Sequence, residues 1–318
     1  MCRARDSRRR YAVCLEHCLR GRPGFDGFRP STQIAIATAH RVHVDPVHPV
    51  QRVEAPEMVG SDRLHVLSYC SVILSLGGGM QLIGHRGAAI QAPENSLAGL
   101  HYVASHNIKQ VECDISVASD GVAVVFHDEY LTRMTGDPRA ILATSSSELE
   151  SLRLWFKGAP STERIPTAVQ WFNEVARLEL YLHCEIKVHD AEVGRVVDAC
   201  LHAFHASELT LAQVRFSSSS VAAIERVRAQ MPESSLGLAC HELIEIEYLD
   251  WDQLGIESVH LSVDGLSNAA LQRIIQNQRT ACVYTVNALA ELEGIDTDLI
   301  DAVFTDDPVA LMSELRSV

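Results

Sequence analysis

Lysine, aromatic residues, long apolar runs and paired cysteines are all scarce in this sequence, and these shortages exclude several classes of protein. Only three of the 27 basic residues in the 318-residue chain are Lys, and aromatics make up 6%. Few aromatics argue against binding to a membrane surface. No stretch reaches the roughly 18 apolar residues that cross a bilayer, the longest candidate being residues 65–76, so we expect no stable membrane insertion.

The nine cysteines show no spacing typical of a metal site. Five of them lie in apolar contexts that suit buried free thiols: Cys113, Cys184, Cys200, Cys240 and Cys282. Free thiols are typical of a reducing compartment, which predicts a cytoplasmic protein.

The charge of the chain divides near Met80. Residues 1–79 hold eleven Arg, no Lys and seven acidic residues, net +4, whereas residues 80–318 hold 16 basic and 34 acidic residues, net −18. Such an acidic body repels phosphate backbones, so nucleic acid is not an expected partner. The same charge tolerates divalent cations.

Residues 1–79 mix an arginine run with scattered Gly and Pro and show no steady periodicity, which predicts a poorly structured N-terminal extension. The run Gly77–Gly79 resembles a translated ribosome-binding sequence, so Met80 is the expected native start. A start at Met58 would instead make residues 65–76 a poor secretory signal and predict a periplasmic protein. The expected domains are thus an extension, 1–79, and a body, 80–318.

From Met80 onward, short β-branched runs alternate with amphipathic stretches, which is typical of βα units. The predicted strands are residues 81–84, 109–115, 122–126, 179–186, 209–216, 236–239, 258–262, 281–286 and 301–304. The predicted helices are residues 96–105, 167–177, 191–203, 220–230, 267–276, 288–294 and 308–315. No glycine-rich dinucleotide fingerprint follows the first strand, which favours an α/β (β/α)₈ TIM-type barrel over a doubly wound sheet.

Two features do not fit a simple barrel. The link between residues 109–115 and 122–126 is too short for a crossover helix, so either one unit lost its helix or the two runs form a hairpin. Residues 127–166 lack clear periodicity and predict a small insertion over the open face of the barrel.

Charged residues cluster where predicted strands end. The clusters are His85-Arg86-Gly87 with Pro93-Glu94-Asn95, Glu112-Cys113-Asp114, His127-Asp128 and Glu185-Ile186-Lys187. The carboxyl ends of the strands in a parallel barrel open on one face, so these side chains are expected to converge there.

Three of the converging groups are carboxylates, Glu112, Asp114 and Glu185. The i, i+2 spacing on a strand directs Glu112 and Asp114 to the same side. Oxygen ligands suit a hard cation, Mg²⁺ or Ca²⁺, whereas zinc would prefer His and Cys. The alternative is a structural salt network with Arg86 and Lys187.

His85 and His127 are candidate proton carriers because imidazole suits acid and base work near neutral pH. Arg86 and Lys187 beside a cation would form a positive locus that binds phosphate, which indicates an anionic phosphate ester as substrate. The other histidines of the body are read as structural.

In this order the clusters resemble the signature of the glycerophosphodiester phosphodiesterase family of the bacterial, soluble type, over residues 82–308. Weaker family-like pieces are Leu131 to Thr135, Thr285-Val286-Asn287 and Thr305-Asp306. The resemblance implies a barrel enzyme that cuts glycerophosphodiesters into sn-glycerol 3-phosphate and an alcohol. It implies His85 and His127 as acid and base, Glu112, Asp114 and Glu185 as metal ligands, and Arg86 and Lys187 as phosphate ligands. Supporting positions fall on Glu94, Asn95, Tyr284 and Asn287.

Two residues depart from the family pattern. Tyr284 replaces the usual Trp and Ser219 the usual Phe, which leaves the preferred head group open. The sequence also leaves the oligomeric state open. The rival functions are a lipid-directed phosphodiesterase of the phospholipase type and a non-catalytic barrel that binds phosphate metabolites.

Overall fold

The structure is a computed structural model that describes residues 79–189 and 191–317. Apart from Gly79, the predicted extension, with the alternative start at Met58, therefore lies outside the described residues. Eight parallel strands form a barrel: β1 (Gln81–Gly84), β2 (Gln110–Val117), β6 (Tyr181–Ile186), β7 (Val214–Ser218), β8 (Ser235–Cys240), β9 (Ser258–Ser262), β10 (Thr280–Tyr284) and β11 (Ala302–Thr305). The barrel closes because β1 pairs with both β11 and β2. The predicted TIM-type barrel is confirmed.

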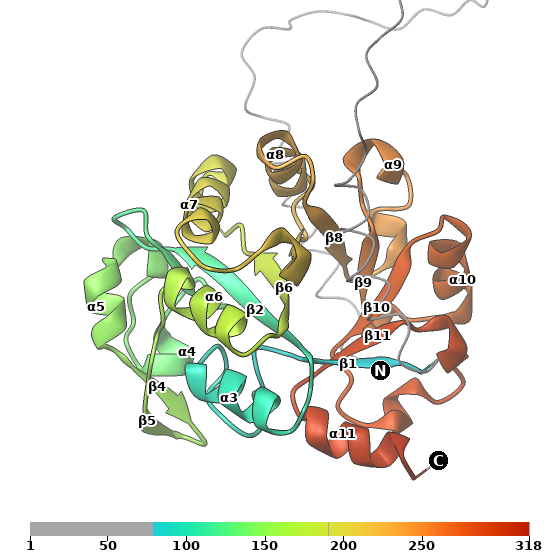
Figure 1. The fold of residues 1–318 in the computed structure, drawn as a ribbon, viewed down its shortest axis with the longest axis horizontal. Coiled ribbons are helices and arrows are strands. Elements are labelled where there is room, and N and C mark those ends of the chain that lie inside the picture. Colours follow the sequence, from blue (N-terminus) through green and yellow to red (C-terminus); the bar gives the residue numbers. More distant parts are fainter. Residues whose placement is uncertain (1–78, 190, 318) are drawn as a thin grey trace, which may run out of the picture. The chain divides into compact units, whose positions relative to one another are not determined.

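Helices surround the barrel (Figure 1). They are α3 (Leu97–Ser105), α6 (Ala168–Arg177), α7 (Val193–His205), α8 (Val221–Gln230), α9 (Trp251–Leu254), α10 (Asn268–Gln276) and α11 (Pro308–Leu315). Local sequence explains where they begin: Thr167 and Gln170 form a capping box on α6, and Asp307 caps α11 ahead of Pro308. In α6 the buried residues recur at helical spacing: Ala168, Trp171, Phe172 and Val175. Burying each large side chain contributes about 1.5–3 kcal/mol.

The ninth predicted strand is a hairpin partner rather than part of the barrel. Strand β3 (Ala123–Val125) runs antiparallel to β2, with Ile115 opposite Val125. Gly121 takes a φ of 86° in the connecting turn, a conformation that glycine adopts without strain. The hairpin is thus the correct alternative of the two left open by the sequence.

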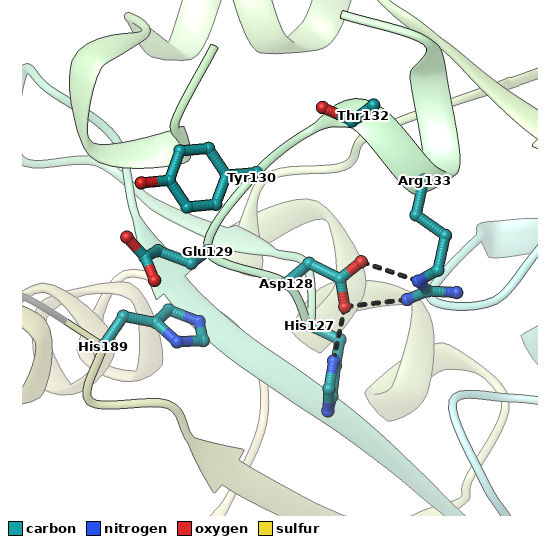
Figure 2. Close-up of a pocket in the computed structure, with 7 residues that line it drawn as sticks. All are labelled: His127, Asp128, Glu129, Tyr130, Thr132, Arg133 and His189. Atoms are coloured by element: carbon teal, nitrogen blue, oxygen red, sulfur yellow. Dashed lines mark hydrogen bonds and ion pairs between the residues drawn. The ribbon is translucent and has the colours of Figure 1, made fainter. Parts of the chain in front are cut away.

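The predicted insertion holds several short elements with a small core of their own. They are α4 (Thr132–Thr135), the 3₁₀ turn η1 (Ile141–Ala143), α5 (Ser146–Ser151), β4 (Arg153–Phe156) and β5 (Ala159–Arg164). Phe126, Leu131, Ile141, Leu149 and Leu154 pack together in this part. The chain enters the insertion through His127 and Asp128, and Arg133 of α4 lies beside them (Figure 2).

Two element predictions were wrong in part. The helix expected at residues 288–294 is only a 3₁₀ turn, η5 (Leu289–Leu292), and Gly294 follows it with a positive φ. The strand expected from residue 209 begins at Val214, because Thr210 and Gln213 cap another 3₁₀ turn, η2 (Leu211–Gln213). The remaining 3₁₀ turns are η3 (Leu243–Glu245), η4 (Val263–Gly265) and η6 (Thr297–Leu299).

The middle of the barrel contains polar as well as apolar side chains. His183 and His260 are buried with ring centroids 5.8 Å apart, and Phe304 packs edge-on to His183. The nitrogen Nε2 of His183 lies 2.8 Å from Oε1 of Gln110. Burial, followed by the charge of Arg215, lowers the pKa of both imidazoles. No helix in the described part of the chain is long and apolar enough to cross a membrane.

Candidate active site

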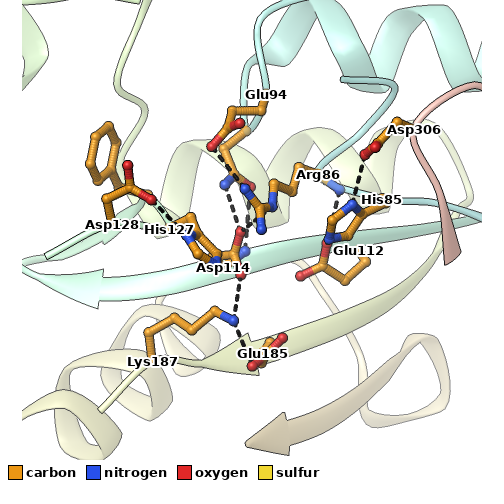
Figure 3. A network of polar contacts seen from close by, with 12 residues as sticks. His85, Arg86, Glu94, Glu112, Asp114, His127, Asp128, Glu185, Lys187 and Asp306 are labelled. Atoms are coloured by element: carbon orange, nitrogen blue, oxygen red, sulfur yellow. Dashed lines mark hydrogen bonds and ion pairs between the residues drawn. The ribbon is translucent and has the colours of Figure 1, made fainter. Parts of the chain in front are cut away.

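Three acidic side chains meet on the neighbouring strands β2 and β6, two of them within β2 and one near the carboxyl end of β6 (Figure 3). Glu112 and Asp114 share one face of β2, and Glu185 of β6 is in register with Asp114. One carboxylate oxygen from each of the three lies within 4.8 Å of the others. The predicted convergence is therefore present.

Burial and mutual repulsion give the acids different properties. Burial, followed by the charges of Asp114 and Glu185, raises the pKa of Glu112 well above its usual value. Burial also opposes ionisation of Asp114, but the charges of Lys187 and Arg86 outweigh it and hold the pKa of Asp114 well below its usual value. A cation among the three oxygens would remove the repulsion that Glu112 experiences.

Two basic side chains contact these acids. Lys187 Nζ lies 2.6 Å from Glu185 Oε1 and 3.2 Å from Asp114 Oδ1. Arg86 Nε lies 3.3 Å from Asp114 Oδ2, and its backbone N–H donates to Glu112 Oε2 at 2.8 Å. The ion pairs expected from the alternative interpretation, a salt network with Arg86 and Lys187, are thus present together with the acid cluster.

The loop that carries Arg86 depends on glycine. Gly87 has a φ of 88°, and a Cβ there would lie 3.1 Å from the Cα of Gly99 in α3. Few other residues adopt this backbone without strain, and any side chain would press on the helix. Gly87 therefore helps to place the Arg86 backbone against Glu112.

The Pro93-Glu94-Asn95 cluster supports the same acids and bases. Asn95, 1% exposed, donates from Nδ2 to Asp114 Oδ2 at 2.8 Å. Glu94 accepts from Arg86 at 3.1 Å. Both residues thus position the polar side chains around the cluster.

Each predicted proton carrier pairs with an aspartate through Nδ1. The distances are 2.7 Å from His85 to Asp306 Oδ1 and 2.7 Å from His127 to Asp128 Oδ1. With Nδ1 as the donor, Nε2 of each ring is left to accept or give a proton. On His85 this atom lies 3.9 Å from Glu112 Oε2.

Sequence reasoning did not select Asp128, Asp306 or Arg133 as site residues. Arg133 donates two hydrogen bonds to Asp128, at 2.6 and 2.9 Å, and two to Glu94, at 2.7 and 2.6 Å. It therefore links the aspartate of His127 to the glutamate that contacts Arg86. The signals available in the sequence were the His-Asp pair and the family-like pieces around Arg133 and Asp306.

The two remaining supporting residues have different surroundings. Asn287 donates from Nδ2 to Asp306 Oδ2 at 3.0 Å and accepts from the Asp306 backbone at 2.8 Å, so it fixes the partner of His85. The hydroxyl of Tyr284 donates to the carbonyl of Cys240 at 3.0 Å. Burial, followed by the charge of Glu185, raises the pKa of Tyr284. Ser219 is exposed.

Known proteins resemble this chain in sequence and in fold. The chain is 23% identical over 238 residues to a glycerophosphodiester phosphodiesterase of Caldanaerobacter subterraneus, 74% of this chain and 97% of that one. It is 32% identical over 117 residues to the Bacillus subtilis protein YhdW, and this match spans about half of that relative, 48%. A solved Oleispira antarctica phosphodiesterase, in complex with the product sn-glycerol-3-phosphate, is 26% identical, with a TM-score of 0.68 over 74% of this chain and 96% of that one.

The family model for glycerophosphoryl diester phosphodiesterases matches residues 85–310, from the first residue of the His85 cluster to α11. This range covers more than half of the chain and all of the site described above. The chain therefore belongs to the glycerophosphoryl diester phosphodiesterase family, as its strand-end clusters predicted.

Proposed function

We propose that this protein hydrolyses glycerophosphodiesters to sn-glycerol 3-phosphate and an alcohol with the help of a divalent cation. The observation that carries the proposal is the meeting of three carboxylates within 4.8 Å, with His85 beside Glu112 and His127 close enough to Asp114 to influence its pKa. The bound product of the Oleispira antarctica relative supports the same chemistry.

Glu112, Asp114 and Glu185 would hold the cation. Their donor set is oxygen alone, which suits Mg²⁺ or Ca²⁺. In addition, Glu112 Oε1 is buried and accepts no hydrogen bond from the described residues. A buried carboxylate oxygen without a donor is costly unless a cation fills that place. When bound, the cation would polarise a phosphoryl oxygen of the substrate.

Arg86 and Lys187 would bind the phosphate. Lys187 has its pKa raised, because the charges of Glu185 and Asp114 outweigh the effect of burial, so it stays positive at any working pH. The guanidinium of Arg86 is placed by Glu94 and Asp114. Two fixed positive charges beside the acid cluster would stabilise the extra negative charge that develops on phosphorus oxygens.

His85 and His127 would move the protons. The nucleophile is a water molecule or the 2-hydroxyl of the substrate, and in either case one imidazole takes its proton while the other protonates the departing alcohol. Asp306 and Asp128 hold the two rings through Nδ1, so each ring presents Nε2 to the substrate.

The test is release of sn-glycerol 3-phosphate by the full-length protein from a panel of glycerophosphodiesters. Chelator should abolish release, and Mg²⁺ or Ca²⁺ added back should restore it. Glu112→Ala should lower activity by at least 10²-fold, whereas Glu163→Ala on β5 should not. Unchanged hydrolysis by Glu112→Ala would exclude this site, and preferential hydrolysis of lysophosphatidylcholine would favour a lipid-directed enzyme.

A cytoplasmic location also belongs to this proposal. The cysteines of the described residues are free and buried, as the sequence predicted. Free thiols persist in a reducing compartment. Cell fractionation with an antibody to the native protein would test it.

A further inference from the structure

A buried serine lies beside the acid cluster, on the next strand of the barrel. Asp114 on β2 is in register with Glu185 on β6, and Glu185 is in register with Ser217 on β7. Residues in register on parallel strands point to the same side of a sheet, and neighbouring strands lie about 4.8 Å apart. Ser217 therefore continues the row of Asp114 and Glu185, on the side of Glu185 away from Asp114.

The hydroxyl of Ser217 is not explained by packing. The residue is 1% exposed, and its Oγ is buried with no hydrogen-bond partner in the part of the chain that the structure describes. The adjacent Ser218, in contrast, donates from Oγ to the carbonyl of Ile186 at 2.7 Å. On the far side, β8 places Gly237 in register with Ser217, and glycine has no side chain to bond. A buried hydroxyl without a partner lowers stability, so this one indicates a contact that forms under other conditions.

Glu185 is the acid of the cluster that has the weakest support. Glu112 and Asp114 each accept a hydrogen bond from a neutral group, at 2.8 Å in both cases. Among the described residues, the Glu185 carboxylate accepts only from the ammonium group of Lys187, at 2.6 Å. The Glu185 side chain is also 21% exposed, against 4% for Glu112 and 1% for Asp114. Its position is therefore the least fixed of the three.

The proposed function gives Lys187 a second task, since it would bind the phosphate of the substrate. Its ammonium group already contacts both Asp114, at 3.2 Å, and Glu185. A phosphate that draws Lys187 towards itself weakens the hold of Lys187 on Glu185. Glu185 then needs a donor that does not bind the substrate. Ser217 meets this condition, because its buried Oγ is out of reach of the substrate.

We propose that Ser217 is a positioning residue for Glu185, and that its hydroxyl donates to the Glu185 carboxylate when the cation is bound. The inference rests on the proposed function, because it requires a cation held by Glu112, Asp114 and Glu185. Carboxylates that bind metal ions are themselves held by hydrogen bonds from neighbouring groups, which orient the ligand and increase metal affinity. Ser217 gives Glu185 the neutral donor that the other two acids already have.

The test measures binding of Mg²⁺ and of Ca²⁺ to the full-length protein by calorimetry. Ser217→Ala should weaken binding of the preferred cation about tenfold, the scale of a lost partner behind a metal ligand. Ser217→Cys, which has a similar size but a weak donor, should weaken it in the same direction. Ser234→Ala is the matched control, because Ser234 is also 1% exposed but precedes β8 at the opposite end of the barrel. It should leave the affinity unchanged.

Thermal unfolding without added cation separates positioning from a structural role. Ser217→Ala removes a hydroxyl that has no partner, so the midpoint should stay the same or rise. Ser234→Ala should lower the midpoint, because it removes a hydrogen bond to the carbonyl of Met231. Added cation should then raise the midpoint of Ser217→Ala less than that of the wild-type protein.

The outcomes distinguish this inference from the proposed function. If the wild-type protein binds a cation and Ser217→Ala binds it within twofold as tightly, the role of Ser217 is wrong and the metal site stands. An equal loss of affinity in Ser234→Ala would also overturn that role. If the wild-type protein binds neither cation, the proposed metal site fails, and the role of Ser217 fails with it.

Discussion

Replacing Asp306 by Asn should disable His85 while leaving the fold intact. The Asp306 carboxylate accepts from His85 Nδ1 through Oδ1 and from Asn287 Nδ2 through Oδ2. An asparagine has one oxygen and one NH₂ group in the same place. Because Asn287 Nδ2 can only donate, the new oxygen should turn to Asn287 and the new NH₂ group to His85.

This exchange reverses the hydrogen bond to the imidazole. With an NH₂ donor facing Nδ1, the neutral ring carries its proton on Nε2, the atom that faces the acid cluster at 3.9 Å from Glu112. A ring in that tautomer cannot accept a proton at Nε2. Asp306→Asn thus disables one of the two proposed proton carriers. We expect kcat to fall about 10²-fold or more, the scale of a positioned acid or base.

The assay is steady-state release of sn-glycerol 3-phosphate across a range of pH, with thermal unfolding measured in parallel. Asp307→Asn is the matched control, since it removes the same charge from the adjacent residue and Asn keeps the cap on α11. Asp306→Asn should lower kcat with little change in KM, and Asp307→Asn should resemble the wild-type protein. A rate for Asp306→Asn within threefold of wild type, with the same pH profile, would refute the role given to His85.

Three further predictions concern the site and the barrel core. His85→Ala and His127→Ala should each lower turnover by about 10²-fold or more, and near-normal rates in both would exclude them as proton carriers. Arg133→Gln should lower kcat about tenfold by releasing Asp128, with no change in cation affinity measured by calorimetry; a change in cation affinity instead would place Arg133 among the metal-site residues. His260 has a pKa lowered from 6.5 to about 3 in the fold, so the unfolded chain takes up its proton first as pH falls below 6.5 and stability is lost there. Between pH 7 and pH 5 the wild-type protein should therefore lose about 2 kcal/mol of unfolding free energy. Urea titrations at the two pH values should show that His260→Gln lacks this loss, and an equal loss in the variant would contradict the role given to His260.

Much of the barrel could be predicted because its strands are buried on both faces. All eight residues of β2 are buried, and the only charged ones among them are the acids Glu112 and Asp114, which point to the site. The spacing of Glu112 and Asp114 then specified which side chains meet. The position of Glu185 followed from the expected pairing of parallel strands, which the register of β2 and β6 confirms.

Contacts that depend on closure of the barrel could not be read from local pattern. Asp306 is 221 residues from His85 along the chain, and the two meet because β11 pairs with β1. Arg133 lies in an insertion whose short elements follow no long periodicity, so its reach to Glu94 depended on how that small core packs. The hairpin of β2 and β3 likewise depended on a five-residue link that permitted two interpretations.

The charges of the site favour the proposed divalent cation. Six carboxylates face three permanent cations in the network of Figure 3 and its Arg133 extension: Glu94, Glu112, Asp114, Asp128, Glu185 and Asp306 against Arg86, Arg133 and Lys187. An anionic substrate would meet this excess of carboxylates at the barrel mouth, where burial, followed by the charges of Asp114 and Glu185, already raises the pKa of Glu112. Arg86 and Lys187 offset part of the excess, although both also pair with these acids. A divalent cation among the three carboxylates would offset the rest, so we expect the proposed cation to assist binding of the phosphate as well as the reaction.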